Sequence, residues 1–138
     1  MAGEVPMSGR VMENEAHELM EEKKYAEAVE MYEKVERLGR KSLCMFNDMA
    51  VALETLNRLS EAESYANKAV EMSQEKSPLI LTNRASIRYN LGKVFKAKED
   101  LDRVNCLLDK KGDWDKFGLE EGHLSYIFKT MKKYSEMS

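Results

Sequence analysis

The sequence predicts an all-α fold made of three stacked helical hairpins. Apolar residues recur at three- and four-residue spacings in successive segments, which is the pattern of amphipathic helices and not of strands. Glycine and proline are scarce, with 7 and 2 among 138 residues, so few positions interrupt these segments. The segments also align with one another at spacings of 34 and 35 residues, which indicates a repeated structural unit.

Each amphipathic segment is long enough for one helix, and most breaks between segments are only a few residues long. Such short links make successive helices pack antiparallel. The expected helices span residues 8–22, 25–38, 42–56, 59–73, 78–91, 94–109 and 117–135.

Several helix ends have identifiable capping residues. Gly39 and Gly92 suit the left-handed conformation that ends a helix, and Asn57 adopts it with a lower preference. Pro78 suits a first helical turn, where its missing N–H has no partner to lose. Ser60, with a glutamate three residues later, has the spacing of a capping box, and a helix start one residue earlier is the alternative.

Six offsets carry matching apolar residues in all three hairpins. Alanines recur where the two helices of a hairpin cross, because only small side chains let their backbones approach closely. One hairpin cannot bury its own apolar faces, so the three are expected to stack. The aligned sets are Ala16, Tyr25, Ala28, Tyr32, Val35 and Leu38; Ala50, Leu59, Ala62, Ala66, Ala69 and Met72; and Ala85, Val94, Ala97, Leu101, Val104 and Leu107.

These offsets resemble those of the tetratricopeptide repeat family. The second-helix phrases KKYAEAVEMYEKVERL, NRLSEAESYANKAVEM and GKVFKAKEDLDRVNCL carry the resemblance, which covers roughly residues 9–108. It departs from the family pattern at Glu15 and Arg84, where an apolar residue is usual. The resemblance implies a right-handed α-α superhelix with repeats at approximately 9–41, 42–76 and 78–109.

The segment 117–135 has an apolar stripe but no second helix after it. By resemblance it is a capping helix over the last hairpin, with Trp114 anchoring the loop that leads to it. A partner-binding or membrane-surface helix is the alternative. We expect residues 8–135 to form a single domain and residues 1–7 to be a disordered leader or tag.

Charge and cysteine content exclude several classes of protein. The net charge of -3 arises from 25 acidic and 22 basic residues that are interleaved, whereas nucleic-acid binding needs a concentrated basic surface. No apolar stretch reaches the length of a membrane span and no signal sequence begins the chain, so we expect a cytoplasmic protein, with a nuclear one possible. Cys44 and Cys106 lack the spacing of a disulfide framework or zinc site and are expected to be core thiols.

The sequence offers little for catalysis. His17 and His123 are far apart, and the chain has no phosphate-cradling glycine-rich loop and no metal-ligand spacing. We therefore expect no enzymatic activity, no cofactor and no metal.

The resemblance implies that the first helices of the hairpins line a concave groove that holds an extended peptide or helix of another protein. Asparagines on that face are poor helix formers, and their amides are suited to binding a ligand backbone. By repeat position, the groove presents Arg10, Glu13, His17 and Met20 from the first repeat, Asn47, Asp48, Val51, Glu54 and Thr55 from the second, and Thr82, Asn83, Ser86, Tyr89 and Asn90 from the third.

One subset of the family binds the acidic C-termini of heat-shock chaperones through a clamp of lysine, asparagine and arginine. The five corresponding places hold Glu13, His17, Asp48, Leu79 and Asn83. Acids in place of cations repel a terminal carboxylate, so we expect a basic or apolar partner segment. A homo-oligomeric scaffold is the alternative, since the chain has 10 methionines that could pair on outer faces. The expected state is a monomer or weak homo-oligomer.

Overall fold

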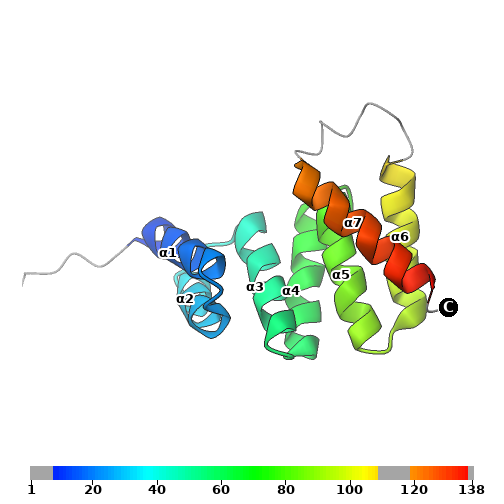
Figure 1. Ribbon diagram of the computed structural model, residues 1–138. Coiled ribbons are helices and arrows are strands. Elements are labelled where there is room, and N and C mark those ends of the chain that lie inside the picture. Colours follow the sequence, from blue (N-terminus) through cyan, green and yellow to red (C-terminus); the bar gives the residue numbers. More distant parts are fainter. Residues whose placement is uncertain (1–7, 109–118, 137–138) are drawn as a thin grey trace, which may run out of the picture.

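The computed structural model describes residues 8–108 and 119–136, and the regular structure of this part is helical throughout. Three antiparallel hairpins stand side by side, and a last helix crosses in front of the third (Figure 1). The longest described helices have 15 residues, and none in this part of the chain qualifies as a membrane span. The helices are α1 (Gly9–Glu21), α2 (Tyr25–Arg37), α3 (Leu43–Thr55), α4 (Leu59–Met72), α5 (Pro78–Asn90), α6 (Val94–Leu108) and α7 (Glu121–Ser135).

A serine begins the first helix of every hairpin. Ser8, Ser42 and Ser77 are the N-caps of α1, α3 and α5, and each side chain accepts a hydrogen bond from the backbone N–H three residues later. Each cap therefore satisfies one donor that the helix start leaves unpaired. These serines follow the same spacing of 34 and 35 residues as the apolar offsets. Pro78 occupies the first turn of α5, as predicted.

The turn inside each hairpin contains one left-handed residue. Lys23, Asn57 and Gly92 have φ of 61°, 60° and 78° at equivalent places. Gly39, in the link after the first hairpin, has φ of 85°. The predictions for Asn57, Gly92 and Gly39 are confirmed.

The predicted capping box at Ser60 is wrong. Helix α4 begins one residue earlier, at Leu59, with Arg58 as an N-cap that makes no side-chain capping bond. The glutamate of the supposed box, Glu63, instead accepts from Arg88 at 3.1 Å and Lys93 at 2.6 Å. Glu63 therefore forms ion pairs with the next hairpin instead of capping the start of α4.

The alanines at the helix crossings are fully buried. Ala16, Ala50 and Ala85 from the first helices, and Ala28, Ala62 and Ala97 from the second, each have no exposed surface. A larger side chain at any of them would push the two helices of its hairpin apart. The repeat offsets therefore correspond to the closest approaches in the fold.

Not every aligned apolar position is buried. Leu38 and Met72, at the ends of α2 and α4, are 61% and 46% exposed, and Val94, at the start of α6, is 42% exposed. These residues lie at helix ends. They follow the repeat spacing of the sequence, but their side chains are only partly buried in the core.

An ion-pair network explains why Arg84 departs from the apolar pattern. Its guanidinium donates to both carboxylate oxygens of Asp100, at 2.6 and 2.9 Å, and Arg88 reaches the same carboxylate at 3.0 Å. Asp100 is only 4% exposed. The network joins α5 to α6, and through Glu63 to α4, in place of an apolar contact.

Helix α7 covers the third hairpin. Ile127 is fully buried in the cluster that contains Val104 and Leu108 of α6, and Tyr134 packs near Leu101. The axis of α7 lies against α5, and its contacts with α6 are fewer. The helix begins at Glu121, whereas the predicted start at 117, Trp114 and the predicted leader 1–7 lie outside the described residues.

Candidate functional site

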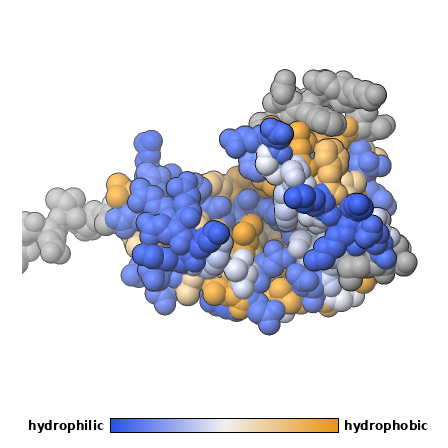
Figure 2. Space-filling view, viewed as in Figure 1, coloured by the Kyte–Doolittle hydropathy of each residue, from blue (hydrophilic) through white to orange (hydrophobic). Residues whose placement is uncertain are grey.

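The first helices α1, α3 and α5 lie next to one another and form one face of the stack. The space-filling view shows this face hollowed between the first hairpin and α7, with polar and apolar residues mixed around the hollow (Figure 2). Most of the side chains predicted to line the groove lie along these three helices. The structure shows how they contact one another across the helix junctions.

At the α1–α3 junction, His17 Nδ1 lies 2.9 Å from Asp48 Oδ2. The same carboxylate oxygen accepts a hydrogen bond from the buried Tyr32 hydroxyl at 2.6 Å. His17 Nε2 lies 3.4 Å from the carboxylate of Glu21. The hydrogen bond to Asp48 is the main reason why the pKa of His17 is raised, since it stabilises the imidazolium form.

Glu13 is held from the other side of the same junction. It accepts hydrogen bonds from Arg40 Nε and the Ser42 hydroxyl. Partial burial opposes ionisation of Glu13, but these two bonds outweigh it and lower the pKa of the carboxyl group. A carboxylate therefore stays at this end of the groove at neutral pH.

At the α3–α5 junction, asparagine and glutamate side chains join the two helices. Asn83 Nδ2 donates to Asn47 Oδ1 at 3.0 Å, and Glu54 accepts from Ser86 at 2.7 Å and from Asn90 at 3.2 Å. Burial raises the pKa of Glu54 in spite of these two bonds. The amides expected to bind a ligand backbone are thus already used, in part, between the helices.

Thr82 does not line the groove. It is fully buried, and its hydroxyl donates to the Pro78 carbonyl at 2.7 Å. Asn83, at 6% exposure, is also largely covered. Of the other predicted residues, Arg10 and Thr55 are exposed, and Met20 and Val51 are partly buried.

At the α5–α7 junction, Tyr89 and Tyr134 stack with their ring centroids 3.8 Å apart and their planes 5° from parallel. The Ser86 and Tyr134 hydroxyls are 3.4 Å apart. Helix α7 therefore occupies the α5 part of the face and leaves the α1 and α3 part uncovered by it. Sequence reasoning missed this because the contact joins segments far apart in the chain.

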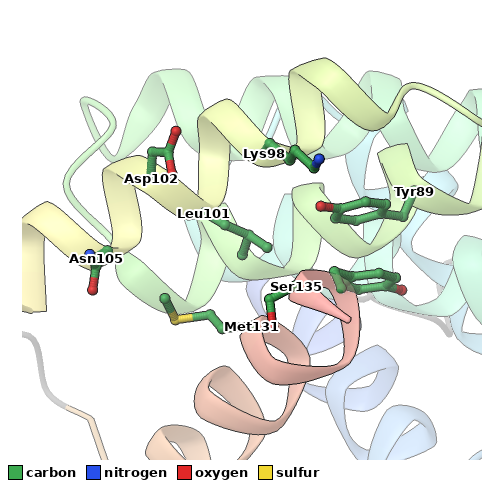
Figure 3. Close-up of a pocket in the computed structure, with 8 residues that line it drawn as sticks. Tyr89, Lys98, Leu101, Asp102, Asn105, Met131 and Ser135 are labelled. Carbon is green, nitrogen blue, oxygen red and sulfur yellow. The ribbon is translucent and has the colours of Figure 1, made fainter. Parts of the chain in front are cut away.

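A pocket of about 360 Å³ opens between α6 and the C-terminal half of α7. Figure 3 shows Leu101 and Met131 facing this space, with Tyr89 at one end and Asp102 and Asn105 along α6. The pocket combines an apolar floor with a polar rim. It is separate from the α1–α3 junction.

The expectation that the cysteines are core thiols is wrong, since Cys44 and Cys106 are both exposed. Cys44 lies one helical turn before Asp48, and its sulfur is 3.8 Å from Asp48 Oδ2. Burial of the thiol group, followed by the charges of Asp48 and Glu13, raises the pKa of Cys44 to about 11. With His17, these residues form a cluster of possible metal ligands that no local sequence spacing reveals.

The fold and this face define a helical-repeat protein of stacked hairpins. A family model described as a tetratricopeptide repeat matches residues 9–40 and 45–76. The third hairpin lies outside the matched residues, but α5 and α6 keep the same alanine crossings. No curated protein sequence matches the chain significantly.

Solved structures with the same architecture cover nearly the whole chain. The first tetratricopeptide domain of Spaghetti (RPAP3), bound to the HSP90 peptide SRMEEVD, is 22% identical with a TM-score of 0.72, covering 94% of this chain and 91% of that one. PcrH from Pseudomonas aeruginosa is 12% identical with a TM-score of 0.74, covering 98% and 99%. The Yersinia enterocolitica secretion chaperone SycD, in complex with a YopD peptide, is 14% identical with a TM-score of 0.66, covering 88% and 91%.

These likenesses concern the fold. The family match itself shows tetratricopeptide repeats at residues 9–40 and 45–76, as the sequence predicted. The fold is an all-α solenoid of helical hairpins.

Proposed function

We propose that the chain is a protein–protein interaction module that binds a basic or apolar segment of a partner protein in the groove over α1 and α3. Two of the similar structures hold peptides of other proteins, an HSP90 peptide in one and a YopD peptide in the other. A shared fold does not specify the ligand. We therefore infer the charge and polarity of the partner segment from the side chains of this groove.

The observation that carries the proposal is the way α7 lies on the α5 part of the same face. Its Tyr134 stacks on Tyr89, and the Lys133 ammonium lies 5.2 Å from the centroid of the Tyr134 ring. Helix α7 is thus an internal example of a helix with basic and aromatic residues seated on first helices. The neighbouring α1–α3 part carries the carboxylates of Glu13 and Asp48.

Carboxylates set the charge of that neighbouring part. At the α1–α3 junction the carboxylates of Glu13, Glu21 and Asp48 outnumber their cationic partners, Arg40 and His17. The α5 arginines Arg84 and Arg88 bind Asp100 instead. An acidic peptide terminus would meet like charges there, whereas lysine or arginine side chains would find partners. We therefore propose that the groove is not of the chaperone-clamp type.

Titration of defined peptides tests the proposal. Amphipathic peptides graded from acidic to basic, and the peptide SRMEEVD, would be titrated by fluorescence anisotropy against the full chain. We expect basic amphipathic peptides to bind more tightly at low salt and to lose affinity in Asp48→Lys, because exposed charge attraction is screened by salt. Phe95→Ala, a change at a 76% exposed residue of α6, is the matched control.

Two outcomes of these titrations would contradict the proposal. Binding of SRMEEVD that is abolished by Glu13→Ala or Asp48→Ala would contradict the alignment of the repeats and the proposed partner chemistry. Loss of peptide binding in Phe95→Ala but not in Asp48→Lys would move the site to the outer face.

Self-association is the second candidate function. Phe95 and Val94 are exposed apolar residues together at the start of α6, at 76% and 42%. Two such side chains are a small patch, so any dimer they support would be weak. Light scattering of the wild type and of Phe95→Ser over a concentration series separates this candidate from groove binding. We propose no catalytic role and no cofactor for the chain.

A further inference from the structure

Three possible metal ligands converge at the α1–α3 junction. His17 Nδ1, Cys44 Sγ and a carboxylate oxygen of Asp48 all lie within 4.8 Å of one another. Cys44 and Asp48 are one turn apart on α3, so they share a face, and His17 approaches from α1. We propose that His17, Cys44 and Asp48 bind one zinc-type divalent ion at the mouth of the groove.

The distances suit a tetrahedral ion. Zinc bonds of about 2.3 Å to sulfur and about 2.0–2.2 Å to nitrogen and oxygen place neighbouring tetrahedral ligands roughly 3.3–3.6 Å apart. The structure has 2.9 Å between His17 Nδ1 and Asp48 Oδ2 and 3.8 Å between Cys44 Sγ and the same oxygen. The separation between His17 and Cys44 is at most 4.8 Å, so metal binding requires side-chain rotations that close it.

The surrounding hydrogen bonds orient two of the ligands. His17 Nε2 faces Glu21 at 3.4 Å, and the Tyr32 hydroxyl donates to Asp48 Oδ2 at 2.6 Å. A carboxylate on the outer nitrogen of a metal-binding histidine is the usual arrangement, because it places the lone pair on the inner nitrogen. With its proton on Nε2, His17 would turn a lone pair toward Asp48 Oδ2, so a cation is needed between them.

Without a metal ion, a proton on His17 Nδ1 joins the ring to Asp48 Oδ2, and the Cys44 thiol lies 3.8 Å from the same oxygen. A divalent ion uses all three groups, releases the thiol proton to solvent, and is attracted by the carboxylates of Glu13, Glu21 and Asp48. The mixed nitrogen, sulfur and oxygen donors favour zinc over magnesium or calcium, which prefer oxygen ligands alone.

The site is open to solvent on one side. The His17 side chain is 49% exposed and that of Asp48 is 16% exposed, so an ion can enter from the groove. Glu13 is held by Arg40 and Ser42 and does not supply the fourth ligand in this arrangement. Water or a side chain of a bound partner would complete the tetrahedron.

Cobalt substitution tests the site on the full-length chain after treatment with a chelator. Titration with Co²⁺ is expected to produce the thiolate-to-cobalt absorption and the visible bands of a tetrahedral site, saturating at one ion per chain and displaced by Zn²⁺. Cys44→Ser should abolish the thiolate band. His17→Ala and Asp48→Asn should weaken binding at least about 10-fold.

Cys106 provides the matched control, because it is also an exposed cysteine but lies on α6. Cys106→Ser should bind cobalt as the wild type does, and in that background Zn²⁺ should slow alkylation of Cys44. This second measurement uses the native ligands and does not depend on a variant that folds poorly. Absence of a thiolate band, loss of the band in Cys106→Ser, or unchanged alkylation with Zn²⁺ would overturn the proposal.

The metal proposal does not rest on the proposed peptide binding. Cobalt spectra and alkylation rates are measured without any peptide. Failure of peptide binding with an intact cobalt site would contradict the proposed function alone, and the reverse result would contradict the metal site alone.

Discussion

Arg84 and Asp100 form a two-bond ion pair between α5 and α6, with donor–acceptor distances of 2.6 and 2.9 Å. The side chain of Asp100 is 5% exposed and that of Arg84 is 13% exposed. The pair therefore stands where tetratricopeptide hairpins usually have an apolar contact. The ion pair contributes to the free energy of unfolding only when both partners are present, because either charge alone would be buried without compensation.

Asp100→Asn should destabilise the chain. Loss of one partner of a buried pair leaves Arg84 and Arg88 facing a neutral amide, and we expect the free energy of unfolding to fall by about 3 kcal/mol. Urea denaturation followed by circular dichroism measures this change. Glu61→Gln, which breaks the exposed pair with Arg58, should leave the midpoint unchanged. Equal effects of the two substitutions would contradict the interpretation.

The His17–Asp48 contact should make stability depend on pH. Since folding raises the pKa of His17, its contribution is complete below the unfolded value of about 6.5 and is lost as pH rises through the folded value. The difference in unfolding free energy between wild type and His17→Gln should therefore be larger at about pH 5.5 than at about pH 8.5 in metal-free buffer. NMR titration should show a lower His17 pKa in Asp48→Asn. The same His17 pKa in both proteins would refute the contact.

The Tyr89–Tyr134 stack should hold α7 in place. Tyr134 is 3% exposed, so Tyr134→Ala should cost about 3 kcal/mol and increase hydrogen exchange in α7 more than in α1–α4. Tyr134→Phe keeps the ring and removes only the hydroxyl near Ser86, and it should retain most of the protection. Uniform loss of protection along the whole chain would show that α7 does not open independently.

Two glycines should respond to alanine in opposite directions. Gly92 has φ of +78°, so Gly92→Ala should lower stability by about 1 kcal/mol even though nothing lies within 4 Å of the added methyl. Gly122 lies in the first turn of α7 with equally open surroundings and no positive φ, and Gly122→Ala should raise stability by up to about 0.5 kcal/mol. Thermal unfolding of the two variants and the wild type measures the direction of each change in stability. Destabilisation by both would show that α7 needs a glycine for another reason.

Sequence reasoning predicted the hairpins well because their information is local. Each helix start and turn repeats at the same spacing. The N-cap serines Ser8, Ser42 and Ser77 also follow this period, although the prediction was made from the apolar residues alone. The capping box at Ser60 failed because its glutamate found stronger partners in the next hairpin. A local motif does not show which tertiary partners compete for its side chain.

For the predicted groove residues too, the sequence indicated the position on the helix but not the tertiary partner. Their helix positions follow from the repeat, but a repeat position does not say whether a side chain is free or bonded to a neighbour. Asn83 was expected to meet a ligand and instead donates to Asn47. Thr82 was placed on the groove and turned out to be buried.

By itself, the sequence determined the number of hairpins and the alanine crossings, because helix period and residue size are properties of the chain. Only the tertiary structure decided that His17, Cys44 and Asp48 meet, that Arg84 pairs with Asp100, and that α7 lies on α5. Each of these contacts joins different helices. Their geometry depends on how the helices are rotated and seated against each other, which no spacing within one helix specifies.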